Sequence, residues 1–238
     1  MNTVGFRSGF LSLLTLAALP VTAANYADTA GDVIVPGSPF PHLDITSVVV
    51  NNDATTLTFK INLAGNPVAT DWGKYLIAID SVPAFGDPAG NGWARPIGLA
   101  AGMDYFVGSW VDSGNGSEIR NWTGAAWNLQ SATYGPNPDN LAISKDTSSV
   151  TISFNFAGLG LGIGSSFFFD IYSSGGGGSD GAVDAAANPG PSIANWSDYY
   201  NSGPNVFSYT LQPIPEPSVA ALLGLGAVLC LRRFRARA

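Results

Sequence analysis

The chain has 238 residues, a formal net charge of −7 and a single cysteine, Cys230. Between Asn25 and Ile214 there are 16 Asp and Glu residues against 5 Lys and Arg residues, so this part carries a charge of −11. So acidic a segment repels phosphate backbones, which argues against nucleic-acid binding. It also lacks the cysteines that a disulfide framework or a zinc site would use.

Residues 1–24 have the features of a secretory signal peptide. A positive start at Met1 and Arg7 precedes a short apolar run from Phe10 to Leu19, and small residues follow at 21–23. A buried helix of the folded domain is the alternative, but polar, Asp-containing sequence begins directly after Ala24. We therefore expect export, with cleavage near Ala23 or Ala24.

The central part, residues 25–212, predicts a single all-β domain. Apolar and polar residues alternate in short runs separated by Gly, Pro, Asn and Asp, and no run has sustained helical periodicity. The pattern predicts an antiparallel two-sheet β-sandwich, jelly-roll-like. The expected strands are Asp44–Asn51, Thr55–Leu63, Lys74–Ser81, Met103–Val111, Val150–Phe156, Phe167–Tyr172 and Val206–Leu211, with a strand–turn–strand unit at Glu118–Ser131.

Three details sharpen this prediction. Asn52-Asp53-Ala54 separates the first two strands and predicts a hairpin. Lys74–Ser81 is almost uniformly apolar, as in a central strand. The longest expected loops are 83–102 and 173–197.

The C-terminal residues 213–238 combine three features in a fixed order. Pro215, Glu216 and Pro217 come first, an apolar stretch from Ser218 to Leu231 follows, and an arginine cluster ends the chain. Proline is tolerated in the first turn of a helix, and arginines favour the cytoplasmic side of a membrane. The stretch predicts a short transmembrane helix, although 14 residues span only about 21 Å of a core of about 30 Å.

These features together resemble the PEP-CTERM sorting signal. The resemblance rests on Pro215, Glu216 and Pro217, the Leu/Ala/Gly stretch, and Arg232, Arg233 and Arg235. It implies that the protein is tethered to the inner membrane of a Gram-negative bacterium, processed by an exosortase-type enzyme, and delivered to the cell surface or extracellular matrix. Passengers of this signal are diverse, so it implies a destination and no activity.

The central domain is similar to family 9 carbohydrate-binding and DOMON-like sandwiches, especially the glucodextranase C-terminal type. The similarity rests on Asp28 to Asp32, on Leu43 to Val48, on the alternating strand around Leu57, and on Tyr75 to Asp80. It implies a β-sandwich that binds carbohydrate, and it favours a calcium site at Asp28 and Asp32.

Calcium takes six to eight hard oxygen ligands, which Asp side chains and loop carbonyls supply. Two pairs have suitable spacing: Asp28 with Asp32, and Asp180 with Asp184 after a run of four glycines. Solvated turns in which Asp caps the local backbone are the alternative for both pairs.

All six tryptophans lie in the central domain. Aromatic rings stack on the C–H faces of sugars, although core packing is the more common role of tryptophan. Trp110 and Trp127 fall in expected strands and are assigned to the core. Trp93, Trp196 and Tyr199 fall in or beside the long loops and are the candidates for ligand binding.

Catalytic patterns are sparse. The one histidine, His42, has no nucleophile elbow to accompany it, so a structural or surface role is expected rather than a catalytic one. Two carboxylates are enough for a glycosidase, which leaves a glycan hydrolase open as an alternative. The sequence favours a non-catalytic polysaccharide-binding module, with a structural or adhesive protein that binds other proteins as the main alternative.

Overall fold

The computed structural model describes residues 23–33, 35–112, 114–188 and 193–214. The predicted signal peptide lies outside the described residues except for residues 23 and 24, and the predicted sorting tail except for Pro213 and Ile214. Among the described residues, no helix is long and apolar enough to cross a membrane.

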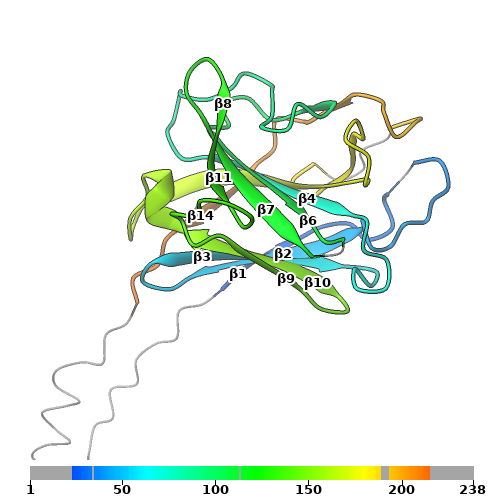
Figure 1. The fold of residues 1–238 in the computed structure, drawn as a ribbon, viewed down its shortest axis with the longest axis horizontal. Helices are drawn as coiled ribbons and strands as arrows, with labels where there is room; N and C mark the ends of the chain where they lie inside the picture. Colours follow the sequence, from blue (N-terminus) through cyan, green and yellow to red (C-terminus); the bar gives the residue numbers. More distant parts are fainter. Residues whose placement is uncertain (1–22, 34, 113, 189–192, 215–238) are drawn as a thin grey trace, which may run out of the picture. The chain divides into compact units, whose positions relative to one another are not determined.

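The strands form two antiparallel sheets that lie face to face (Figure 1). The smaller sheet has the order β1-β2-β3-β10-β9. Its strands are β1 (Ala24–Ala27), β2 (Ile45–Asn52), β3 (Thr56–Leu63), β9 (Ala142–Lys145) and β10 (Ser149–Asn155).

The larger sheet has the order β12-β11-β4-β6-β7-β8, and β14 pairs with the other end of β11. Its strands are β4 (Lys74–Asp80), β6 (Tyr105–Trp110), β7 (Gly116–Trp122), β8 (Trp127–Ala132), β11 (Ser166–Ser174), β12 (Ala182–Ala185) and β14 (Phe207–Thr210). A short parallel pair, β5 (Ile97–Gly98) with β13 (Tyr200–Asn201), and a 3-10 turn, η1 (Phe156–Leu159), complete the described elements.

The buried apolar residues form two separate clusters. The first lies between the sheets, where the Phe59 ring of β3 stacks on Phe154 of β10 and meets Phe169 of β11 edge-on. The second lies on the outer face of the larger sheet, which the segments before β6 and after β12 cover. Strand β4 contributes to both, with Ile77 facing the first cluster and Leu76 the second.

The double burial of β4 confirms the prediction of a central strand and explains its uniformly apolar sequence. The sequence-predicted strands and the β2–β3 hairpin are confirmed, with ends that differ by one or two residues. Asp53 closes the hairpin by accepting hydrogen bonds from the backbone N–H groups of Thr55 and Thr56. The sequence missed the short strands β1, β5, β9, β12 and β13.

Candidate functional site

Three aspartates from distant parts of the sequence meet at one end of β12. Asp28 directly follows β1, Asp32 lies four residues later, and Asp184 belongs to β12. One carboxylate oxygen of each lies within 4.8 Å of the others. The structure therefore unites Asp28 and Asp32 with one member of the second pair that the sequence suggested.

The backbone around these aspartates is fixed by hydrogen bonds. The Asp28 N–H donates to the Thr46 carbonyl at 3.1 Å, which keeps the start of the loop on β2. The turn at Gly31 has φ +86°, a conformation that favours glycine, and its N–H donates to the Asp44 carboxylate at 2.8 Å. Asp184 accepts from the backbone N–H groups of Ile45 and Ala185.

The electrostatics of the cluster oppose three ionised carboxylates. Burial and the charges of Asp28 and Asp32 raise the pKa of Asp184 to about 9. Burial, with a contribution from Asp32, raises the pKa of Asp28 to about 7. The basic side chains of the described residues contact other groups. Arg95 donates to the Ser174 hydroxyl and to the Asp180 carbonyl. The other four form ion pairs: Lys60 with Asp146, Lys74 with Asp112, Arg120 with Glu118, and Lys145 with Asp71.

The cluster has the chemistry of a site for a hard divalent cation. Its donors are carboxylate oxygens, which calcium and magnesium prefer. Asp28 Oδ2 and the nearby Asp44 Oδ1 are buried and accept no hydrogen bond. A bound cation would offset both the mutual repulsion and these unpaired oxygens. Asp28, Asp32 and Asp184 would be its protein ligands, with loop carbonyls and water to complete the shell.

Asp180 lies apart from this group. Its carboxylate accepts a hydrogen bond from the Gly177 N–H at 2.8 Å, and its carbonyl accepts one from Arg95 at 3.1 Å. This is the local turn that the sequence analysis held as the alternative for Asp180. The same alternative does not describe Asp184, which is fully buried in a strand.

A row of three aromatic rings crosses the outer face of the larger sheet. Trp93 and Trp110 have ring centroids 6.2 Å apart, and Trp110 and Tyr134 are 5.9 Å apart, each pair tilted by 39°. Tyr134 is 62% exposed, and both tryptophans are partly exposed. We call Trp93, Trp110 and Tyr134 the aromatic row.

Two glycines allow the tryptophans of the aromatic row to lie close to the sheet. A Cβ at Gly108 would overlap the Trp93 ring, and a Cβ at Gly116 would overlap the Trp110 ring. The rings therefore rest directly on the backbones of β6 and β7. Any larger residue at either glycine would have to displace a ring.

A carboxylate and a guanidinium lie beside the row. Glu118 accepts hydrogen bonds from Trp93 Nε1 at 2.9 Å, from Arg120 Nε at 2.8 Å and from the Tyr134 hydroxyl. Burial opposes ionisation, but these three donors outweigh it and hold the pKa of Glu118 below its usual value. Glu118 is therefore an anionic acceptor at neutral pH.

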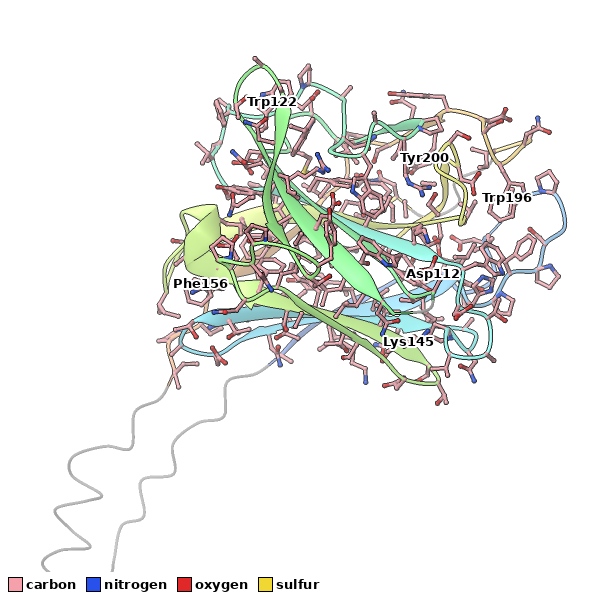
Figure 2. The ribbon with its side chains drawn as sticks, in the orientation of Figure 1. Asp112, Trp122, Lys145, Phe156, Trp196 and Tyr200 are labelled. Atoms are coloured by element: carbon pink, nitrogen blue, oxygen red, sulfur yellow. The ribbon has the colours of Figure 1, made fainter. Side chains whose placement is uncertain are left out.

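Trp196 belongs to a different aromatic cluster, which we call the Trp72 cluster and which consists of Phe40, His42, Trp72 and Trp196. Trp196 lies edge-on to Phe40 at 5.1 Å and to Trp72 at 5.8 Å between ring centroids. Phe40, His42 and Trp72 also line a cavity of about 260 Å³. Figure 2 shows Trp196 at the right of the domain and Trp122 near its top.

The remaining sequence candidates have distinct surroundings. Tyr199 is 60% exposed, and its hydroxyl lies against Gly98 of β5. His42 is buried with its ring centroid 4.4 Å from that of Trp72, and burial lowers its pKa, in keeping with a structural role.

The assignment to the core holds in part for Trp127, which is half-buried against the second cluster, but not for Trp110, which is half-buried and belongs to neither cluster. In β6, Val107 faces the first cluster, so Trp110, three residues on, points to the outer face. Trp127 packs on the second cluster, and its Nε1 donates to Asp87 at 2.9 Å. The alternation of side chains along β6 could have predicted the outward position of Trp110, whereas no sequence pattern indicated that Tyr134 belongs to the aromatic row.

Comparison with known proteins assigns the chain to no family. The chain matches no protein-family model, and no curated protein matches it significantly.

Proposed function

We propose that this protein is an exported surface or matrix protein whose β-sandwich binds polysaccharide without catalysis. The observation that carries the proposal is the aromatic row, with the Glu118–Arg120 pair beside it, on one sheet face. Apolar ring faces suit the C–H faces of sugars, and the charged pair supplies an acceptor and donors for hydroxyl groups. We associate this role with a jelly-roll-like β-sandwich, the fold of carbohydrate-binding modules.

The charge of the domain selects among polysaccharides. With 16 acidic and 5 basic residues between Asn25 and Ile214, it repels chains that carry uronate or phosphate groups. A neutral polysaccharide is therefore the proposed ligand. Affinity electrophoresis through gels with neutral or acidic polysaccharides tests this directly. Retardation by a neutral polymer, reduced in Trp110→Ala, is the expected result, and migration unaffected by every polymer contradicts it.

A divalent cation is proposed to complete the fold. Calcium at Asp28, Asp32 and Asp184 would stabilise the start of β2 and the β12 edge, because the three carboxylates join these segments. Calorimetric titration of the chelated protein with calcium or with magnesium would measure the affinity and the selectivity of the site.

The proposed export and sorting rest on sequence features at the two ends of the chain. A signal peptide at 1–24 and a sorting tail with Pro215, Glu216 and Pro217 support export, a transient inner-membrane tether and processing by an exosortase-type enzyme. Replacing these three residues by alanine should block processing in a Gram-negative host, which the mass of the mature protein would reveal. Unchanged processing would remove the tail from the proposal.

A glycan hydrolase is less well supported. A general acid needs a carboxyl that is protonated near neutral pH, but the hydrogen bonds to Glu118, the carboxylate beside the aromatic row, hold its pKa low. The carboxyls with raised pKa values, Asp28 and Asp184, belong to the aspartate cluster and not to the aromatic row. The protein-binding alternative finds its best support in the exposed side chain of Phe168 and the apolar surface beside it.

A further inference from the structure

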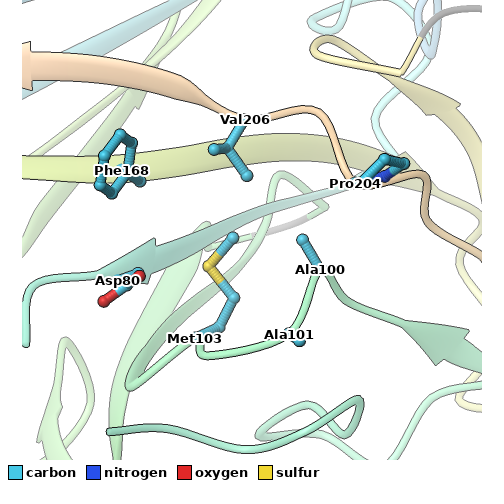
Figure 3. Close-up of a pocket in the computed structure, with 7 residues that line it drawn as sticks. All are labelled: Asp80, Ala100, Ala101, Met103, Phe168, Pro204 and Val206. Atoms are coloured by element: carbon cyan, nitrogen blue, oxygen red, sulfur yellow. The ribbon is translucent and has the colours of Figure 1, made fainter. Parts of the chain in front are cut away.

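A second cavity lies on the outer face of the larger sheet, away from the aspartate cluster and the aromatic row. Its volume is about 310 Å³, at the lower end of the range for small-molecule sites. Figure 3 shows Phe168 and Val206 across from Met103 and Ala100, with Asp80 and Pro204 at opposite ends. We call it the Phe168 pocket.

The walls of the Phe168 pocket are apolar apart from one carboxylate. Met103 and Ala100 are buried, whereas Phe168 is 45% exposed at the mouth. Asp80 is the single polar side chain among the described residues that line the pocket. One of its oxygens, Oδ1, is buried and accepts no hydrogen bond.

The negative charge of Asp80 has no local compensation. Asp104, whose carboxylate accepts from Ser81 and Val82, lies close enough for the charge of Asp80 to raise its pKa, after burial as the larger cause. The five basic side chains of the described residues all contact groups other than these two aspartates. The Phe168 pocket is thus both apolar and electronegative.

This combination selects a particular kind of cation. A primary ammonium brings three N–H donors, for which the lining side chains offer only Asp80 as acceptor. A trimethylammonium group brings a positive charge and no donor, and its methyl groups suit the alanine, methionine and valine walls. The half-exposed Phe168 ring can attract the cation through its π face.

We propose that the Phe168 pocket binds small molecules that carry a quaternary ammonium group, with Asp80 as counter-ion and Phe168 as cation–π partner. This site is independent of the proposed polysaccharide binding, since it shares no residue with the aromatic row. The probe is choline, and its neutral isostere 3,3-dimethylbutan-1-ol is the matched control ligand.

The test observes the pocket directly. The sequence holds two methionines, Met1 and Met103, so methyl-labelled methionine in the full-length chain gives a reporter inside the pocket. Choline should shift the Met103 methyl signal and bind at least tenfold more tightly than the neutral isostere. Equal affinity for the two compounds, or no shift of Met103, would overturn the proposal.

Variants separate the two roles. Asp80→Asn keeps the side-chain shape and should weaken choline binding at least tenfold, to the level of the isostere. Phe168→Leu should weaken it about fivefold. Asp71→Asn removes the same charge from an exposed position beside Lys145 and should leave choline binding unchanged. An equal loss in Asp71→Asn would mean that only net charge matters and would overturn the assigned pocket.

Vesicles separate a free ligand from a lipid headgroup. If the Phe168 pocket takes free molecules, choline should bind while phosphatidylcholine vesicles fail to sediment the protein. Sedimentation by phosphatidylcholine but not by phosphatidylglycerol vesicles, abolished in Asp80→Asn, would keep the quaternary ammonium chemistry and assign it to a membrane.

Discussion

The two faces of the larger sheet follow different rules. The inner face packs on the smaller sheet through alternating apolar side chains such as Ile77 and Phe169. The outer face is covered by long irregular segments and carries the aromatic row and the Phe168 pocket. Regular strands build the first face, whereas loops position the second. This is the division expected when a rigid scaffold displays a binding surface.

Neighbouring residues of β11 offer the strongest test of this difference. Phe169 is fully buried against Tyr26, Phe59 and Phe207, whereas Phe168 is half exposed on the other face. Phe169→Ala should lower the free energy of unfolding by about 3–5 kcal/mol, because it leaves a large cavity. For a domain of this size the melting temperature should fall by roughly 10 °C.

Phe168→Ala is the control, with an expected loss below about 1 kcal/mol. Denaturation of the two variants by urea gives both values. Similar losses in both would show that the outer face contributes to stability as much as the core does.

Calcium should produce the next largest effect, because it links the loop after β1 to β12 at the edge of the larger sheet. A ligand that binds only the folded state adds about 2.7 kcal/mol at a hundredfold excess over Kd. We expect a melting temperature about 5–10 °C higher in calcium than in chelator. The double variant Asp28→Ala with Asp32→Ala should lose this response.

Asp180→Ala should keep the calcium response, because Asp180 accepts its hydrogen bond from Gly177, outside the cluster. The same melting curve in calcium and in chelator would argue against the metal centre. A response lost in Asp180→Ala would place the cation at the glycine-rich turn instead.

The pH dependence of the chelated protein follows from the same cluster. Asp184 and Asp28 have pKa values of about 9 and 7 in the folded state, above the usual value of about 3.9. Between pH 4 and these values the folded state binds more protons than the unfolded state, so stability falls as pH rises. The slope should reach about 1.4 kcal/mol per pH unit for each carboxyl that stays protonated.

Melting temperatures in chelator should therefore decrease from about pH 5 to pH 8, with the contribution of Asp28 ending near pH 7 and that of Asp184 near pH 9. Calcium should flatten this decrease, since it stabilises the ionised carboxylates. A melting temperature that rises over the same interval in chelator would contradict the raised pKa values.

The contrast between the faces also shows which parts of the fold and the site could be predicted from the sequence. Alternation at Leu57, Phe59 and Ile61 of β3 predicted the inner core, because a two-residue period encodes which side is buried. Asp28 and Asp32 were found because they are close in sequence. The sequence grouped Asp184 with Asp180 and not with Asp28, because its approach to Asp28 depends on the pairing of β12 with β11 and on the contact with Ile45.

The aromatic row could not be predicted from the sequence. Trp93 comes from a loop, Trp110 from β6, and Tyr134 from the turn after β8, and only the folded sheet brings them together. The small residues Gly108 and Gly116 were the local trace of this arrangement, since each leaves room for a ring. Without knowing the pairing of β6 with β7, the two glycines indicate only weak strands.

The smallest expected effect tests whether polysaccharide binds at Tyr134 or at Tyr199. Tyr134 and Tyr199 are 62% and 60% exposed, but Tyr134 belongs to the aromatic row, whereas Tyr199 lies beside β5. Stacking on one aromatic ring contributes about 1 kcal/mol at the low end, so Tyr134→Ala should weaken polysaccharide binding about fivefold to tenfold. Tyr199→Ala should leave the affinity and, like Tyr134→Ala, the melting temperature nearly unchanged.

Tyr134→Phe separates the ring from its hydroxyl, which donates to Glu118. If the ring stacks on sugar, the phenylalanine variant should keep most of the affinity, because its apolar face is intact. If the hydroxyl matters mainly by orienting Glu118, Tyr134→Phe should lose as much as Tyr134→Ala. A loss confined to Tyr199→Ala and Trp196→Ala, measured by affinity electrophoresis, would move the polysaccharide site to the Trp72 cluster and its cavity.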